Sequence, residues 1–280
     1  MSAPPPLVTL GVPVRNGAAM LARALDSIVA QDHPNLEVVV SDNASSDTTP
    51  EIVNDYAARY PFIRVLRQDT PLTAIDNFMV VLREAKGEFF AWCAHDDTRT
   101  PDFVSAMLPA FDDPRVVLVF GDMCVWDGIA APQPRPDYDF DTVGLTRRQR
   151  LRKAAHMQCM HIYGLWRTGA LRAIRYSYTH WWSDMPIMLA AAATSCFRHV
   201  PGPQFIYYEV PKTDAQRAAY QDNRQRRSKV GDLASLMRAA FLTTYRTAGA
   251  TAAIEATAFL AEKYAVQFSS RLLGRKAPGR

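Results

Sequence analysis

A histidine and two adjacent carboxylates, His95, Asp96 and Asp97, end an apolar run that begins at Phe89. The run is short and bounded by turn residues, which predicts a buried strand. The last residues of the strands in a parallel sheet lie at the edge where open α/β sheets bind ligands. Two carboxylates there repel each other unless a cation or hydrogen-bond donors lie close by. A phosphate-bridging Mg²⁺ or Mn²⁺ would offset this repulsion. The alternative is that the two acids lie on the surface and cap the helix after Pro101.

The elements that must position these acids alternate between strands and helices. Apolar periodicity predicts strands near 7–12, 36–41, 63–66 and 88–94, with helices near 18–31, 49–59 and 73–86. This alternation is typical of a parallel sheet with crossover helices. The remaining pattern predicts strands near 115–120, 162–166, 195–200 and 204–209, a long loop at 127–145, and helices near 101–111, 146–157, 168–174, 184–193 and from 214 onward.

Composition sets broad limits on the class of protein. The 280 residues are 48% hydrophobic and 21% charged, which suits one large α/β domain with an appendage. A net charge of +4 is too small to indicate nucleic-acid binding. The four cysteines are far apart and form no CxxC pair, so we expect free thiols in a reducing compartment. The first residues resemble no signal peptide and no apolar stretch could span a membrane, so we expect a cytoplasmic protein.

The tips of the predicted strands carry polar clusters that should converge in one crevice. The first strand runs into 13–17, the second into Asp42 and Asn43, and the fourth into Asp96 and Asp97. Neither a dinucleotide-binding glycine motif nor a P-loop is present, so phosphates must be held in another way. Asp97 with a divalent metal is the available candidate.

Four segments together resemble the inverting glycosyltransferases of family 2, which have the GT-A fold. They are VPVRNG at 12–17, SIVAQ at 27–31, EVVVSDNASSDT at 37–48, and KGE at 86–88 leading into His95-Asp96-Asp97. The resemblance covers residues 7–125. It implies an α/β GT-A domain over 1–212, with a mostly parallel central sheet, a nucleotide-binding half to about 125 and an acceptor half from about 126. A helical extension would follow at 213–280.

The resemblance also implies roles for individual residues. Asp42 would bond the donor base, Asp96 would face the ribose and phosphates, and Asp97 would hold Mn²⁺ or Mg²⁺. The remaining donor-binding positions would be Pro13, Val14, Arg15, Asn16, Asn43, Asp76 and Asn77. Two departures stand out: His95 replaces an acid found in many members, and the segment around Asp76 lacks their basic residue.

A general base must deprotonate the acceptor hydroxyl, and the family usually supplies it from an acid at a helix start in the second half. Asp184 matches that context, and a simple helix-capping role is its alternative. Asp122 is a weaker candidate for the base. Trp181 and Trp182 are candidates for stacking on the acceptor sugar, although buried tryptophans are more common.

Basic residues gather after about residue 145, notably on the predicted helix at 146–157. They are either solvated faces or a surface for anionic lipid. The resemblance implies a nucleotide-diphosphate sugar, most often a UDP-sugar, as donor, and a glycan or lipid-linked acceptor in bacterial polysaccharide or glycolipid assembly. The protein would then lie in the cytoplasm or at the inner face of the membrane, and its C-terminal helices could instead form a homodimer.

Two other classes of protein compete with this interpretation. One is a catalytically silent nucleotide-sugar-binding scaffold of a polysaccharide complex, which the presence of Asp97 and Asp184 argues against. The other is a nucleotidyltransferase, whose Gly-rich basic loop after the first strand would need more room than 14–17 offers.

Overall fold

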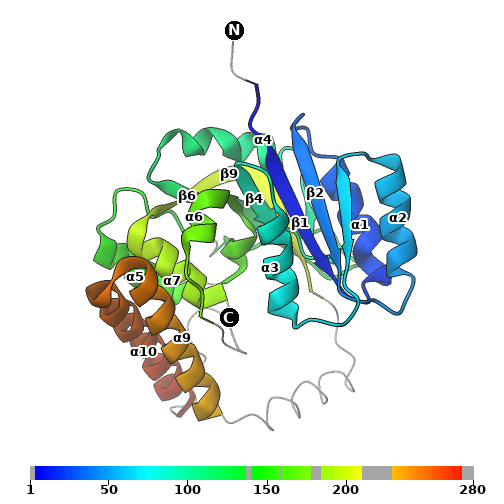
Figure 1. Ribbon diagram of the computed structural model, residues 1–280. Helices are drawn as coiled ribbons and strands as arrows, with labels where there is room; N and C mark the ends of the chain where they lie inside the picture. The colour runs from blue at the N-terminus through cyan, green and yellow to red at the C-terminus, as the bar shows by residue number, and fades with distance from the viewer. Residues whose placement is uncertain (1–3, 137–139, 158, 178–183, 210–228, 273–280) are drawn as a thin grey trace. The chain divides into compact units, whose positions relative to one another are not determined.

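The computed structural model describes residues 4–136, 140–157, 159–177, 184–209 and 229–272 (Figure 1). The chain divides into two compact units, neither of which is continuous in sequence. The first unit comprises Met1–Tyr138, His161–Arg172 and Arg198–Glu209, and the second comprises Asp139–Met160, Ala173–Phe197 and Val210–Arg280.

Parallel strands form the heart of the first unit. The central strand, β1 (Val8–Val14), pairs with β2 (Leu36–Asp42) on one side and with β4 (Phe89–Trp92) on the other. The strand β3 (Ile63–Arg67) adds to β2, also in parallel. The crossovers are helices α1 (Ala18–Val29), α2 (Thr49–Arg59) and α3 (Ala74–Glu84), which confirms the predicted α/β class.

The sheet continues beyond β4 with strands in antiparallel pairs. Among the described residues it has nine strands in the order β3-β2-β1-β4-β8-β6-β9-β5, with β7 added to β6. These later strands are β5 (Thr98–Arg99), β6 (Val116–Trp126), β7 (Gln133–Pro134), β8 (Leu165–Arg167) and β9 (Cys196–Tyr208). Short helices α4 (Phe103–Met107), η1 (Leu108–Asp112) and α6 (Thr168–Ala173), with η3 (Cys159–Tyr163), complete the described elements of this part.

Two predictions about this region were wrong in detail. The strands expected at 195–200 and 204–209 form one continuous strand, β9, in which Gly202 adopts a φ of 114° that other residues rarely take. The predicted loop at 127–145 contains β7, which pairs with β6 through Cys124 and Val125.

The second unit is a set of packed helices: α5 (Arg147–His156), α7 (Asp184–Thr194), α9 (Lys229–Ala248) and α10 (Ala250–Leu272). Helix α7 is buried on every side from Met185 to Ala193, as expected of an apolar helix with α5 and α9 against it. Helices α9 and α10 meet at Gly249, whose positive φ ends α9. These units divide the chain differently from the predicted boundary at residue 212, because α5 and α7 pack with the C-terminal helices.

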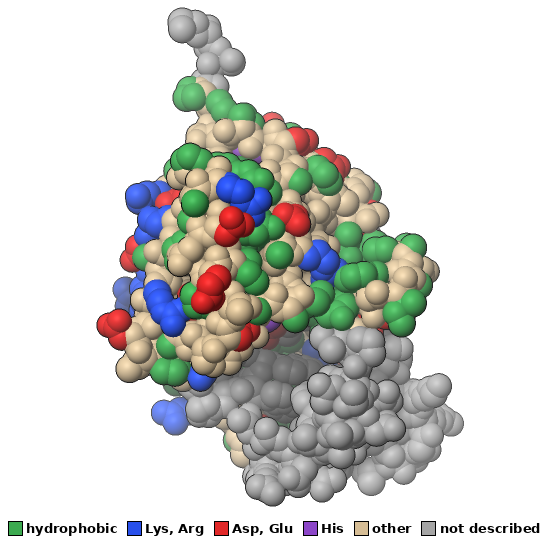
Figure 2. All heavy atoms as spheres, turned by 90° about the vertical axis from the view of Figure 1, so that its right-hand side faces the viewer, with side chains coloured by type: hydrophobic (Ala, Val, Ile, Leu, Met, Phe, Trp, Pro, Cys, Tyr) green, Lys and Arg blue, Asp and Glu red, His purple; other side chains and the backbone are tan. Residues whose placement is uncertain are grey.

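The basic residues of α5 are engaged within the second unit. Arg147 lies 3.3 Å from Glu255 of α10, and Arg152 lies 2.9 Å from Glu262. Arg150 donates to the carbonyl of Ala192 at 2.9 Å and so caps the end of α7. Part of the positive charge that suggested a lipid surface therefore serves to join helices. Figure 2 shows basic and acidic side chains interspersed on one face of the protein.

No helix within the described residues is both long enough and apolar enough to cross a bilayer.

Candidate functional site

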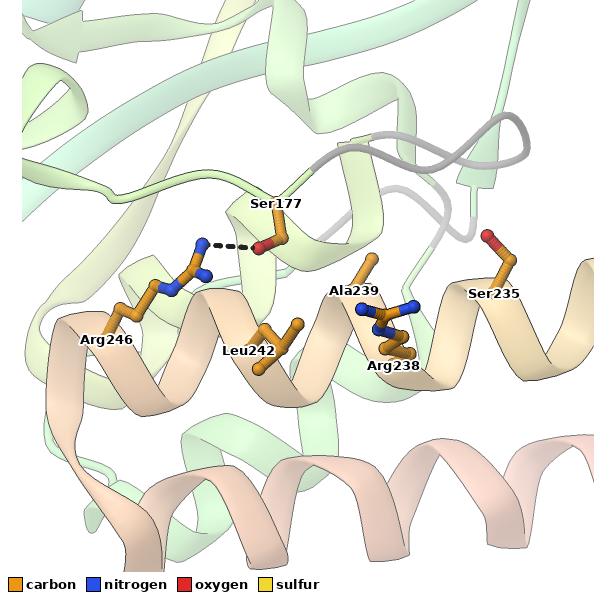
Figure 3. A pocket seen from close by; sticks show the side chains of 6 residues that line it. All are labelled: Ser177, Ser235, Arg238, Ala239, Leu242 and Arg246. Carbon is orange, nitrogen blue, oxygen red and sulfur yellow. Dashed lines mark hydrogen bonds between the residues drawn. The ribbon is translucent and has the colours of Figure 1, made fainter.

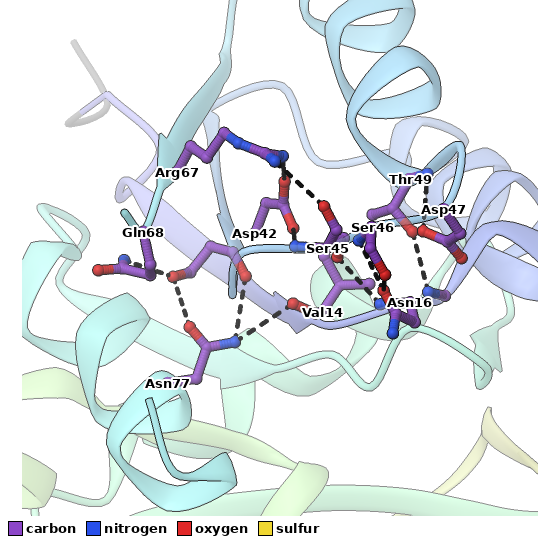
Figure 4. A network of polar contacts seen from close by, with 12 residues as sticks. Val14, Asn16, Asp42, Ser45, Ser46, Asp47, Thr49, Arg67, Gln68 and Asn77 are labelled. Atoms are coloured by element: carbon purple, nitrogen blue, oxygen red, sulfur yellow. Dashed lines mark hydrogen bonds and ion pairs between the residues drawn. The ribbon is translucent and has the colours of Figure 1, made fainter. Parts of the chain in front are cut away.

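The loops that follow β1 and β2 are tied to each other by reciprocal hydrogen bonds (Figure 4). The backbone N–H of Asn16 donates to Ser45 Oγ at 2.9 Å, and the N–H of Ser46 donates to Asn16 Oδ1 at 2.9 Å. Gly17 N–H donates to Thr49 Oγ1 at 2.9 Å. Asn16 has a φ of 50°, a conformation that asparagine tolerates better than most residues. These contacts fix the carboxyl edge of the central strands before any ligand arrives.

Asp47 joins the starts of two helices at this edge. Its Oδ2 accepts the N–H of Ala18 at 3.1 Å, and its Oδ1 accepts the N–H of Thr49 at 3.0 Å. Hydrogen bonding, chiefly from the Thr49 side chain, lowers the pKa of Asp47. A negative charge is also favoured at helix N-termini. Asp47 therefore supports the loops, although no role of its own was predicted for it from the sequence.

Asp42 ends β2 as a buried carboxylate with an arginine against it. Its side chain is 2% exposed and forms an ion pair with Arg67 of β3. Its Oδ1 accepts the N–H of Ser45 at 3.0 Å, and Arg67 also donates to the carbonyl of Ser45 at 3.1 Å. Arg67 was not predicted, although its place at the end of the neighbouring strand follows from parallel register. The pair holds Asp42 in one orientation.

Two predicted donor-binding amides already have partners inside the protein. Asn77 of α3 accepts the hydroxyl of Ser41 at 2.6 Å and donates to the Ser41 carbonyl at 3.1 Å. Asn43 accepts the N–H of Leu72 at 2.7 Å and donates to the carbonyl of the same residue at 3.0 Å. Their polar groups thus anchor α3 and the loop before it to the end of β2.

The other predicted residues of this edge lie in varied surroundings. Asp76 is exposed and completes a helix cap, accepting the hydroxyl of Thr73 at 2.7 Å. Pro13 and Val14 are buried in β1, whereas Arg15 is exposed and contacts no partner among the described residues. Arg15 is therefore the predicted donor-binding side chain with the most freedom to reach a ligand.

The turn after β4 holds Asp97 almost completely buried, with 2% of its surface exposed. Its Oδ1 accepts the N–H of Tyr208, at the end of β9, at 2.9 Å. Burial raises the pKa of Asp97 to about 7, while the Tyr208 N–H and the charges of Arg99 and Arg23 act in the opposite direction. No donor in the described parts of the chain reaches Oδ2 of Asp97, so this oxygen can accept a ligand.

Arg23 of α1 lies beneath the same turn, and sequence reasoning missed it. Its Nη2 donates to the backbone carbonyl of Asp96 at 2.5 Å. Its guanidinium lies over the rings of Trp126 and Tyr208, 4.0 and 4.9 Å from their centroids. Arg23 therefore links the ends of β6 and β9 to the Asp96–Asp97 turn. Nothing in the helical pattern around residue 23 distinguishes it from a surface arginine.

His95 packs against the loop after β1. A Cβ atom at Gly17 would lie only 2.6 Å from Cδ2 of His95 and 2.6 Å from a methyl of Val14. Glycine at 17 thus allows the turn after β4 to lie close to the end of β1.

The topology sets the spacing of the acids. Strands β2 and β4 flank β1, with Asp42 opposite Val14 and Trp92 opposite Gly11. Neighbouring strands are about 4.8 Å apart, so the two acidic strand ends are separated by roughly 10 Å. The extended base, ribose and diphosphate of a nucleotide could cross this distance.

The predicted base and acceptor residues belong to other parts of the chain. Asp184 is the first residue of α7 in the second unit, and its Oδ1 accepts the N–H of Met185 at 3.1 Å. Trp181 and Trp182 lie outside the described residues. The weaker candidate, Asp122, has both oxygens engaged, by Nε2 of His199 at 2.8 Å and by the N–H of Gly202 at 2.9 Å.

Comparison with known proteins agrees with this geometry. The family model "Glycosyl transferase family 2" matches residues 9–175, which is more than half of the chain. The chain belongs to this family. The match includes all the acids of the carboxyl edge and ends before Asp184.

Sequence relatives match part of this family 2 chain. An uncharacterized protein of Mycobacterium bovis is 44% identical over 86 residues, which is 29% of this chain and 24% of that protein. An uncharacterized glycosyltransferase of Rickettsia typhi is 29% identical over 117 residues, or 41% and 36% of the two chains. The putative glycosyltransferase EpsH of Bacillus subtilis is 31% identical over 109 residues, or 39% and 31%. The chain thus spans about a quarter to a third of these relatives.

Solved structures share the fold over nearly the whole chain. Residues 1–349 of S. aureus TarS in complex with UDP-GlcNAc superpose with a TM-score of 0.67 at 19% identity, covering 92% of this chain and 72% of that chain. The mannosyltransferase PcManGT from Pyrobaculum calidifontis, in complex with GDP-Man and Mn²⁺, gives a TM-score of 0.55 at 20% identity and covers 94% and 81%. These similarities confirm the predicted GT-A type of fold.

Proposed function

We propose that this family 2 protein transfers a sugar from a nucleotide-diphosphate sugar to an acceptor hydroxyl, with inversion at the sugar's C1. The observation that carries the proposal is the buried Asp97, next to Asp96, on the same sheet edge as the oriented Asp42. Structural neighbours with UDP-GlcNAc or GDP-Man bound support a donor of this chemical class.

The donor is proposed to lie across the ends of β2, β1 and β4. Asp42, held by Arg67, would accept hydrogen bonds from the base, and Asp96 would face the ribose and phosphates. Arg15 is exposed at this edge and would add a positive charge beside the phosphates. Pro13, Val14 and Asn16 would form the floor, while Asn43, Asp76 and Asn77 would hold the surrounding backbone in place.

The residues at the turn fit a divalent cation. Asp97 is a buried carboxylate with one oxygen open to a ligand, and a cation would offset the cost of burying its charge. No cluster of three metal-binding side chains occurs within the described residues. This agrees with Mg²⁺ or Mn²⁺ bound by one or two carboxylates together with substrate phosphates. When bound, the metal would neutralise charge on the leaving diphosphate.

The protein's own part in the reaction is to position the donor and accept one proton. The acceptor oxygen forms a bond to C1 of the sugar while the bond from C1 to the diphosphate oxygen breaks. Asp184 is proposed to accept the proton of the acceptor hydroxyl. Its carboxylate lies at the start of α7, where the helix dipole favours a negative charge.

The acceptor is proposed to be a glycan or a lipid-linked sugar of bacterial polysaccharide or glycolipid assembly, stacked against Trp181 or Trp182. The name of EpsH supports glycosyl transfer but not a particular acceptor.

A thermal-shift screen tests the donor part of the proposal. The purified protein would be heated with UDP-, GDP-, TDP- and CMP-sugars, each with Mn²⁺ or with EDTA. A ligand that binds only the folded state raises the melting midpoint as its concentration increases. At 100 times its Kd it adds about 2.7 kcal/mol to the free energy of unfolding. Sugars carrying one particular nucleotide base should raise the melting midpoint, and they should do so only in the presence of Mn²⁺. No stabilisation by any nucleotide sugar at millimolar concentration would contradict the proposal.

A further inference from the structure

The second unit contains a pocket that the proposed donor site does not use. It has a volume of about 320 Å³ and lies between α9 and the backbone at Ser177 (Figure 3). Its lining residues are Ser177, Ser235, Arg238, Ala239, Leu242 and Arg246. All of them belong to the second unit, whereas Asp42, Asp96 and Asp97 belong to the first.

One face of α9 supplies most of this pocket. Residues 235, 238, 239, 242 and 246 recur at a spacing of three or four, so they line one side of the helix. Two arginines lie toward the two ends of this row, with Leu242 between them (Figure 3). The rise of an α-helix places their Cα atoms about 12 Å apart, and their long side chains can close on a ligand between them.

The opposite rim of the pocket is held in place by two hydrogen bonds. Ser177 N–H donates to Oγ1 of the fully buried Thr243 at 2.9 Å. Arg246 Nη1 donates to Ser177 Oγ at 2.8 Å. The guanidinium of Arg246 is therefore partly fixed in the orientation seen, with its remaining N–H groups available.

The positive charge of the pocket is not balanced by a described carboxylate. Arg238 is exposed and forms no ion pair or hydrogen bond with any residue that the structure describes. Arg246 bonds only to a hydroxyl within the same residues. Glu255 and Glu262 of α10 pair with arginines of α5, and Asp232 of α9 is not in the lining. Two cations and two hydroxyls thus face one cavity.

We propose that this pocket binds a phosphate or diphosphate group. Guanidinium groups donate parallel pairs of hydrogen bonds to phosphate oxygens, and two of them match the charge of a dianion. The Ser177 hydroxyl, which accepts from Arg246, can donate its own hydrogen. Leu242 and Ala239 offer an apolar strip on which the organic part of a phosphate ester could lie. The inference does not depend on the proposed glycosyl transfer.

Calorimetric titration of the full chain tests this assignment. The titration would be run in EDTA, so that no metal assists binding, with two probes: inorganic pyrophosphate and geranyl diphosphate. The variants are Arg238→Gln and Arg246→Gln. The matched control is Arg148→Gln, which removes one exposed positive charge of the same unit outside the pocket. Asp97→Asn is the control for binding at the donor edge, and melting curves check that each variant folds.

We expect at least one probe to bind. Each pocket variant should weaken binding about tenfold, because it removes a charged hydrogen-bond donor. Both controls should bind within about twofold of the wild type. Equal affinity for both probes would assign the site to a free diphosphate. Tighter binding of geranyl diphosphate would assign it to a lipid-linked one, and both results support the proposal. Failure of both probes at millimolar concentration, or equal weakening by Arg148→Gln, would overturn it. Neither result bears on nucleotide binding at the donor edge.

Discussion

Replacing Asp97 by asparagine should stabilise the metal-free protein, although it removes the proposed metal ligand. Burial raises the pKa of Asp97 from 3.8 to about 7, so the folded state binds the proton more tightly than the unfolded state. Stability is therefore lost as the pH rises from about 4 to about 7. At about 1.4 kcal/mol per pKa unit, the ionised carboxylate destabilises the fold by about 4 kcal/mol above pH 7. Asparagine has nearly the same shape and can still accept the N–H of Tyr208.

Urea unfolding in EDTA measures this effect. At pH 8 the variant should be more stable than the wild type by about 4 kcal/mol. At pH 5.5 the difference should fall to about 2 kcal/mol, because folded Asp97 is then mostly protonated and only the ionisation of the unfolded state still separates the two proteins. The matched control is Asp113→Asn, in which a partly buried carboxylate is replaced. Hydrogen bonds from Arg115 lower the pKa of Asp113 to about 2, so this control should lose stability near neutral pH. The reasoning would be refuted if Asp97→Asn were no more stable than the wild type at pH 8, or if its added stability did not decrease toward pH 5.5.

Three further substitutions test other parts of the site. Asp184→Asn should lower transfer by at least about 100-fold while leaving donor binding unchanged, as steady-state kinetics and titration would show, since a general base contributes to turnover alone; unchanged transfer would exclude it as the base. Arg67→Met should cost about 1–2 kcal/mol in urea unfolding, because it leaves buried Asp42 without its cation, and equal stability would show that the pair contributes nothing. Gly17→Ala should cost about 1–3 kcal/mol, since the new methyl meets His95, and a neutral result would mean that the ring moves away freely.

Much of the first unit could be predicted because its elements are locally encoded. The strands β1 to β4 are apolar runs ended by turn residues, and the observed helices α1, α2 and α3 lie within a few residues of the predicted ranges. The convergence of Asp42 and Asp97 on one edge followed from parallel order alone. The antiparallel strands β5 and β7 were missed, because two residues are too few to show a period.

The missed residues share a physical reason. Arg23, Arg67 and Tyr208 reach the site through pairings distant in sequence, and no local pattern marks them. Whether an amide such as Asn77 faces a ligand or its own backbone also depends on the packing of α3. The grouping of α5 and α7 with the C-terminal helices has a similar origin, since the ion pairs from Arg147 and Arg152 to α10 follow from tertiary contacts.

The most direct test of the donor site is a titration of wild type and Asp97→Asn with UDP-GlcNAc and GDP-mannose, each with Mn²⁺ and with EDTA. We predict that one nucleotide binds the wild type with Mn²⁺, and that EDTA or the substitution weakens it at least tenfold, which is about 1.4 kcal/mol. Binding by Asp97→Asn with the affinity and Mn²⁺ dependence of the wild type would contradict the assignment of Asp97 to the metal and the donor site built on it.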